Sequence, residues 1–312
     1  MKISYIQHAD IDKKKWDQCI ADSKNELIYA YSYYLDVMSK NWDALIWKDY
    51  EMIMPLTWNK KFGISYLRQP AFTQQLGIFG NSLFENNITE KFIDKAMELF
   101  PFAEINLNFG NEYATMKKCN LILPLNNSFV EIKNSFNNDL IKNIKKANRN
   151  NLIYTSSEDI ETAIQSYKKT YSAKFHSSKK DFEDFQQLCL LLKTKEQIFV
   201  RKVNSKEGHL LAIAIFLKDK KRIYNIMSTT FSEGRKLEAN HFLLHELIKE
   251  FSGQNLILDF EGSEIPSIHS FYKKFGAIEQ QYPFVRINKL KSWQRLFKNL
   301  NDQYKFSKRN QA

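Results

Sequence analysis

Residues 208–230, GHLLAIAIFLKDKKRIYNIMSTT, decide the fold of this chain. Their hydrophobic runs predict paired strands over 209–217 and 222–228, and a further strand is expected just upstream over 198–203. After this group the pattern predicts, in order, a helix over 237–251, a strand over 256–260, a helix over 265–275 and a strand over 281–287. Antiparallel strands followed by alternating helices and strands indicate an α+β fold with a central mixed sheet.

The first third of the chain shows weaker signals of the same kind. Residues 44–47 and 51–57 predict strands paired across a polar turn. Residues 89–100, TEKFIDKAMELF, carry apolar side chains at helical spacing, so they predict an amphipathic helix. A strand is expected after it, over 104–109. These elements fit a second copy of the same kind of domain.

Length and composition indicate a folded protein of two domains. A chain of 312 residues exceeds the size at which a single hydrophobic core stops growing. Its 43% hydrophobic and 14% aromatic residues exclude an intrinsically disordered chain. The pattern resets near Pro124, so we predict one domain over 1–124 and a second, with the functional site, over 125–312.

The sequence carries no strong motif for membrane insertion, secretion or metal binding. The chain shows neither a long uncharged apolar window nor a signal peptide at its start, so we expect a cytoplasmic protein. Cys19, Cys119 and Cys189 are widely spaced and have no histidine at zinc spacing, which favours buried thiols. His241 and His245 are four residues apart, but no third ligand is signalled. We therefore expect no metal.

Basic residues gather in two places in a chain of net charge +11. The tail from Arg286 onward has eight basic residues and one acid. The second cluster lies on a predicted helix over 137–149 and includes Lys142, Lys145, Lys146 and Arg149. Such patches suggest an anionic partner: tRNA, a CoA-type cofactor or an acidic membrane surface. A solvated helix face and biased base composition explain the same residues equally well.

A basic C-terminal helix is predicted over 290–300. Leu290, Trp293, Phe297 and Leu300 form one apolar stripe, with basic residues elsewhere. The stripe predicts docking of this helix onto the core, and peripheral contact with an anionic membrane is the alternative.

Several segments together resemble a known family. They are NNDLIKNIKKANRNNL (137–152), residues 208–230, LEANHFLLHELIKEF (237–251) and LILDFEGSEIPSIHSFYKKFGA (256–277). In order and spacing they resemble the second domain of the FemAB-like branch of the GNAT-fold acyltransferases. The resemblance implies tandem GNAT-like domains, each a central mixed sheet flanked by helices.

The resemblance also implies an activity. FemAB-like proteins transfer an acyl or aminoacyl group to an amine by direct attack, so acyl-CoA or aminoacyl-tRNA is the expected donor. An amine-bearing small molecule or cell-wall precursor is the expected acceptor, and the basic helix is the expected tRNA contact. Two alternatives stay open: an acetyl-CoA-dependent N-acetyltransferase, and a non-catalytic module that binds RNA or an anionic surface.

The expected donor site departs from the family pattern. Acetyl-CoA-dependent members have an Arg-x-x-Gly-x-Gly/Ala loop whose backbone N–H groups bind pyrophosphate. The resemblance keeps Arg235, with Lys236 beside it as a phosphate clamp, but Glu238 and Asn240 stand where glycines are expected. The predicted donor-binding residues are Arg235, Lys236, Ser228, Thr229 and Asn240. A carboxylate at Glu238 disfavours an anionic group, which is consistent with a donor other than a freely bound CoA ester.

Three residues are the predicted catalytic groups. Tyr272 stands where many GNAT enzymes have a tyrosine that protonates the leaving group, although it also fits the apolar face of a short helix. Asp259 and Glu261 lie at the end of a predicted strand, where open sheets bind ligands. Strand alternation would point both acids to one face, as a base or an amine anchor; an ordinary strand end is the alternative.

Overall fold

The computed structural model describes residues 2–81, 87–171, 177–262, 264–292 and 295. The elements up to residue 124 are β1 (Ile3–Ile6), α1 (Lys13–Asp22), α2 (Ser32–Met38), β2 (Trp42–Trp47), β3 (Met52–Lys61), β4 (Ile64–Arg68), β5 (Phe79–Gly80), α3 (Ile88–Leu99), β6 (Phe102–Asn106) and β7 (Lys117–Pro124), with short 3-10 turns η1 (His8–Asp10) and η2 (Ile28–Ala30). Those that follow are α4 (Phe129–Asn134), α5 (Asn138–Arg149), β8 (Ile153–Ser157), α6 (Ile160–Tyr171), α7 (Lys179–Thr194), β9 (Ile198–Asn204), β10 (Leu210–Lys218), β11 (Arg222–Thr230), α8 (Ser232–Lys236), α9 (Ala239–Phe251), β12 (Ile257–Asp259), α10 (Pro266–Lys273) and β13 (Ile278–Asn288).

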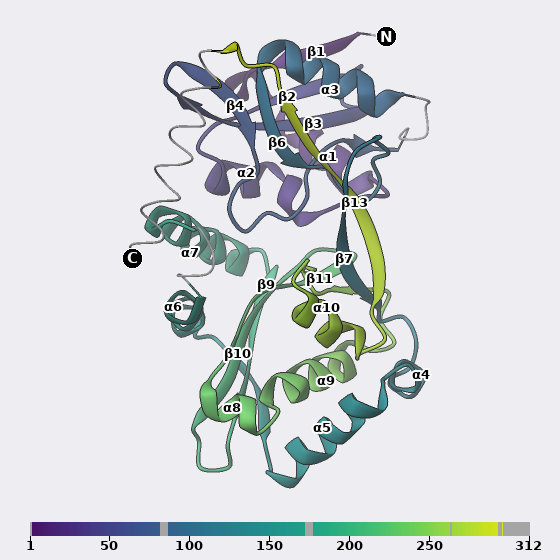
Figure 1. The fold of residues 1–312 in the computed structure, drawn as a ribbon, viewed down its shortest axis with the longest axis vertical. Coiled ribbons are helices and arrows are strands. Elements are labelled where there is room, and N and C mark those ends of the chain that lie inside the picture. Colours follow the sequence, from purple (N-terminus) through teal and green to yellow (C-terminus); the bar gives the residue numbers. More distant parts are fainter. Residues whose placement is uncertain (1, 82–86, 172–176, 263, 293–294, 296–312) are drawn as a thin grey trace.

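One hydrogen-bonded path joins the strands of both halves. Its order is β1-β2-β3-β4-β6-β13-β7-β12-β11-β10-β9-β8, with β5 paired to β3 at the side. β13 makes the connection, because residues 284–288 pair with β6 and residues 278–283 pair with β7 (Figure 1). The β4–β6 and β11–β12 pairs are parallel and the other strand pairs are antiparallel, so the sheet is mixed.

Helices cover both faces of the second half of the sheet, which explains its hydrophobic strands. Residues 211–217 of β10 are all buried. A strand covered on both faces needs a continuous apolar run rather than an alternating one. Ile213 and Ile215 belong to a core formed with α6, α7 and the tyrosines of the first half. Leu211 and Ala214 belong to a second core, formed with α5 and α9.

The predicted α+β class, with a mixed sheet flanked by helices, is confirmed. Helix α6 begins at Ile160, after residues 153–157, which form β8 and pair with β9. The domain boundary at Pro124 stays a prediction; β7, which ends there, lies between β12 and β13. Most of the predicted C-terminal helix (290–300) and most of the basic tail fall outside the described residues. Within the described part of the chain, every helix is too short or too polar to cross a membrane.

Candidate functional site

The sheet opens between β11 and β12. These parallel strands pair only at Arg222–Ile257, Ile223–Leu258 and Tyr224–Asp259. β12 then ends, while β11 continues beside β10 as far as Thr230. Among the strands that the structure describes, β11 therefore has a neighbour on one side only beyond Tyr224. The backbone groups on that side of β11 lack a partner there among the described strands, and an extended ligand at this opening can pair with them.

A β-bulge lies at the start of this opening. Ile215 pairs with Met227 and Leu217 pairs with Tyr224, which leaves Asn225 and Ile226 opposite a single residue of β10. Bulges turn side chains in new directions and occur often beside functional sites.

Two polar groups of β11, one at the bulge and one beyond it, are buried without a partner in the described part of the chain. At the bulge, the side-chain Nδ2 of Asn225 donates a hydrogen bond to the hydroxyl oxygen of Tyr272 at 3.4 Å. The Asn225 Oδ1 and the hydroxyl of Thr229 on the same strand are buried and have no partner among the described residues. Buried polar atoms without partners are rare in proteins, so both are suited to bind a ligand.

Glu261 is the acid whose environment is most unusual. It follows the end of β12 with a left-handed backbone at φ 57°, an uncommon conformation for a non-glycine residue. Its carboxylate accepts a hydrogen bond from the hydroxyl of Tyr29. Glu261 keeps some exposed surface, but burial of the carboxyl group raises its pKa to about 8. No ion pair of the described residues involves this carboxylate.

Tyr29 reaches the site from the first half of the chain, and no sequence motif points to it. Its ring packs edge-on against the rings of Tyr34 and Tyr224, at centroid distances of 5.5 and 5.3 Å. The Tyr224 hydroxyl accepts a hydrogen bond from the backbone N–H of Ile28 at 3.1 Å and donates to Asp219. These contacts fix the 3-10 turn that carries Tyr29, so they orient its hydroxyl toward the second half of the chain.

Tyr272 lies on α10, on the other side of the opening. Its ring stacks on Phe260 with centroids 4.6 Å apart. Burial raises the pKa of Tyr272 above its usual range, and the nearby Tyr167, Tyr171 and Glu261 act in the same direction. The phenol therefore stays protonated at physiological pH, as a proton donor must. Its predicted role as general acid stays a prediction.

Asp259 does not share the surroundings of Glu261. Its carboxylate pairs with the Arg222 guanidinium at 2.9 Å, and these side chains are only 1% and 3% exposed. It also accepts hydrogen bonds from the Asn120 side chain and the backbone N–H of Glu261. Because β12 ends at Asp259, strand alternation alone does not place Glu261, and the expectation that both acids point to one face stays a prediction. Asp259 is a structural ion-pair partner here, and a proton-transfer role for it stays a prediction.

The predicted phosphate clamp lies on the short helix α8. Arg235 and Lys236 are both exposed, and the Arg235 Nε donates to the backbone oxygen of Thr230 at 3.2 Å. The Ser228 hydroxyl donates to Asn240 Oδ1 at 3.4 Å. The predicted donor-binding residues thus lie around the end of β11 and the start of α9, and their role stays a prediction.

The start of α9 presents a carboxylate. Glu238 precedes the helix with a left-handed backbone at φ 62°, the conformation that glycine adopts most easily. Its carboxylate pairs with Lys146 Nζ at 2.8 Å and with His241 Nδ1 at 3.0 Å. Lys146 comes from α5, so the predicted basic patch lies beside the donor loop. Lys142, Lys145 and Arg149 are exposed on the same helix.

Comparison with solved structures identifies proteins of the same fold. No family model matches the sequence, and a search of curated proteins gives no match. The crystal structure of FemX is similar, with a TM-score of 0.64 and 12% sequence identity, over 90% of this chain and 96% of that chain. The structure of L-PGS from Bacillus licheniformis has a TM-score of 0.51 and 10% identity, over 90% and 93%.

A third solved structure agrees with these two. The C-terminal domain (DUF2156) of a putative lysylphosphatidylglycerol synthetase from Agrobacterium fabrum has a TM-score of 0.51 and 8% identity, over 88% of this chain and 91% of that one. At such identities a likeness establishes the fold alone. The chain therefore has the fold of FemX, as the resemblance to FemAB-like GNAT-fold proteins predicts.

Proposed function

We propose that the protein transfers an aminoacyl group from aminoacyl-tRNA to an amine on a small molecule or cell-wall precursor. The observation that carries this proposal is Glu261, a carboxyl group with a pKa of about 8 at the opening between β11 and β12. Such a carboxylate is basic enough to accept a proton from an attacking amine, and part of it is ionised near neutral pH.

The chemistry needs one proton acceptor and one proton donor. The acceptor amine attacks the ester carbonyl of the donor, and Glu261 takes the proton that the nitrogen loses. A C–N bond forms, the ester C–O bond breaks, and the Tyr272 hydroxyl gives its proton to the leaving ribose oxygen. The proton on Glu261 then passes through solvent to Tyr272, so both groups return to their starting states. Tyr29 holds the Glu261 carboxylate through its hydrogen bond.

The donor loop favours tRNA over CoA. A pyrophosphate at the start of α9 would meet the Glu238 carboxylate, which Lys146 and His241 already hold in place. Like charges at such close range repel, and the CoA phosphates would have to displace this group. A tRNA ester does not need a pyrophosphate site.

The exposed basic side chains of α5 support the same donor. Lys142, Lys145 and Arg149 lie next to the donor loop, where they can contact tRNA phosphates. The proteins of similar fold include FemX and the C-terminal domain of a putative lysylphosphatidylglycerol synthetase, and the resemblance to FemAB-like proteins implies aminoacyl or acyl transfer. We place the reaction in the cytoplasm, where charged tRNA is made.

The test is a transfer assay with matched donors. Purified protein is incubated with tRNA charged with radiolabelled amino acids, and separately with labelled acetyl-CoA. The acceptors are a nucleotide-linked cell-wall peptide with a free amine and, as a hydroxyl control, phosphatidylglycerol vesicles. The proposal expects a labelled amide from charged tRNA alone. Product from acetyl-CoA alone identifies an acetyltransferase, and tRNA binding without any product identifies a non-catalytic RNA-binding module.

A further inference from the structure

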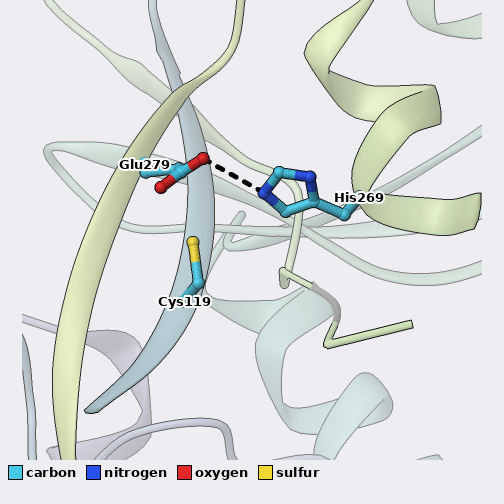
Figure 2. Close-up of side chains that lie close together, drawn as sticks. All are labelled: Cys119, His269 and Glu279. Carbon is cyan, nitrogen blue, oxygen red and sulfur yellow. Dashed lines mark ion pairs between the residues drawn. The ribbon is translucent and has the colours of Figure 1, made fainter. Parts of the chain in front are cut away.

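Three side chains with metal-binding chemistry meet beside the proposed active site. Cys119 on β7, His269 on α10 and Glu279 on β13 each direct one ligand atom into the same space (Figure 2). These three atoms all lie within 4.8 Å of one another. We propose that Cys119, His269 and Glu279 bind a single Zn²⁺ ion, a site separate from the proposed acyl-transfer chemistry.

The distances agree with a nearly preformed tetrahedral site. Zinc bonds nitrogen and oxygen at about 2.0–2.1 Å, so a tetrahedral N–Zn–O edge measures about 3.3 Å. His269 Nε2 and Glu279 Oε1 are 3.3 Å apart. The sulfur needs an N–S edge of about 3.6 Å, given a Zn–S bond of about 2.3 Å. Rotation of the Cys119 side chain supplies the remaining adjustment.

The ligand set selects the kind of metal. A thiolate and an imidazole together favour Zn²⁺ or Co²⁺ over Mg²⁺ and Ca²⁺, which prefer oxygen ligands. Three protein ligands leave the fourth position for water. Cys119 and His269 are partly exposed and Glu279 is exposed, so an ion can enter from solvent.

Metal binding would replace one hydrogen bond of Cys119 and one ion pair of Glu279. The Cys119 thiol donates to the backbone oxygen of Asn120 at 3.4 Å, and Lys273 Nζ lies 3.7 Å from Glu279 Oε1. When Zn²⁺ binds, the S–H bond breaks, a Zn–S bond forms and the proton passes to solvent. Lys273 loses its place beside Glu279, because its charge repels the ion.

The site would add a second anchor to α10, the helix that carries both His269 and Tyr272. Its residues are at most partly buried, and Phe271 and Tyr272 pack on the core beside Phe260. The ion would tie α10 to β7 and β13. It would therefore hold Tyr272 in position.

The test titrates metal-free protein with Zn²⁺ by calorimetry and with Co²⁺ by absorption. We expect one ion per chain and a thiolate-to-cobalt charge-transfer band. Cys119→Ser and His269→Gln should each remove the band or weaken binding at least tenfold, and Glu279→Gln should weaken it at least tenfold. Cys19→Ser, which changes a partly buried thiol elsewhere, should bind like the wild type.

A variant that should bind Zn²⁺ more tightly complements those that should bind it more weakly, because misfolding cannot produce tighter binding. Lys273→Gln removes the competing charge and is expected to tighten Zn²⁺ binding at least threefold. Circular dichroism shows whether each variant is folded. The proposal is overturned if folded wild-type protein shows no cobalt–sulfur band, or if Cys119→Ser binds both metals as the wild type does. These outcomes do not depend on transferase activity.

Discussion

Asp259 and Glu261 are separated by one residue, yet removal of their charges should change the free energy of unfolding in opposite directions. Glu261→Gln is expected to stabilise the protein above neutral pH, and Asp259→Asn is expected to destabilise it. The difference follows from their surroundings: Glu261 has no cationic partner among the described ion pairs, whereas Asp259 is paired with buried Arg222.

The size of the Glu261 effect follows from its pKa. Burial raises that pKa from 4.5 to about 8, so the folded state retains a proton that the unfolded state releases. The contribution of Glu261 to the free energy of unfolding is therefore fully present below pH 4.5 and is lost as the pH rises to about 8. Each pH unit in this window costs about 1.4 kcal/mol, with an upper limit of about 5 kcal/mol. Glu261→Gln removes this loss, so its advantage should grow from near zero at pH 4.5 to about 2–5 kcal/mol at pH 9.

Asp259→Asn leaves the Arg222 guanidinium in the interior without its counter-ion. Removal of one partner from a buried pair costs about 3–5 kcal/mol. The carboxylate's hydrogen bonds from Asn120 and the Glu261 backbone are disturbed as well. This variant should therefore be less stable than the wild type at every pH from 6 to 9.

Urea unfolding followed by tryptophan fluorescence, repeated from pH 5 to pH 9, measures both effects. Other titrating groups are common to the three proteins and cancel in the differences. The reasoning is refuted if the stability difference for Glu261→Gln is the same at pH 5 and pH 9, or if Asp259→Asn loses less than about 1 kcal/mol.

Three further predictions concern activity and binding. The kcat/KM of the wild type should gain about tenfold per pH unit up to pH 8 from Glu261, which acts as carboxylate, on top of the slope that deprotonation of the acceptor amine gives; Glu261→Gln should remove the first contribution only, and an unchanged slope in the variant assigns it to another group. Calorimetry with CoA should give no heat for the wild type, whereas Glu238→Gly should bind CoA because the carboxylate is gone; micromolar binding by the wild type contradicts this. Reversal of charge at Lys142, Lys145 and Arg149 should weaken tRNA binding at least tenfold in a filter assay without changing the Tm, because these side chains are exposed; unchanged binding places tRNA elsewhere.

The sequence predicts those parts of the fold that depend on local patterns. The apolar runs of β10 and β11 and the amphipathic spacing of α5 are visible in short windows, because burial dictates side-chain type there. The strand end at Asp259 and the helix with Tyr272 are likewise where the sequence places them, within a few residues.

Contacts between distant segments could not be predicted. Tyr29 meets Glu261 only because the first half of the chain packs onto the second, and no local pattern encodes that contact. The left-handed backbone of Glu261, two residues after the end of β12, is likewise not encoded by any local pattern. Cys119 and Glu279 lie far apart in sequence, and the antiparallel pairing of β7 with β13 brings them together beside His269 of α10. A spacing motif cannot reveal such a cluster.

A single-turnover transfer measurement tests the central claim most directly. Wild type, Glu261→Gln and, as a matched control, Glu264→Gln, which changes an exposed acid nearby, are mixed with labelled aminoacyl-tRNA and an amine acceptor. The account predicts amide formation by the wild type and by Glu264→Gln, and a rate lower by about a hundredfold or more in Glu261→Gln. Equal rates in all three proteins would contradict the assignment of Glu261 as the base.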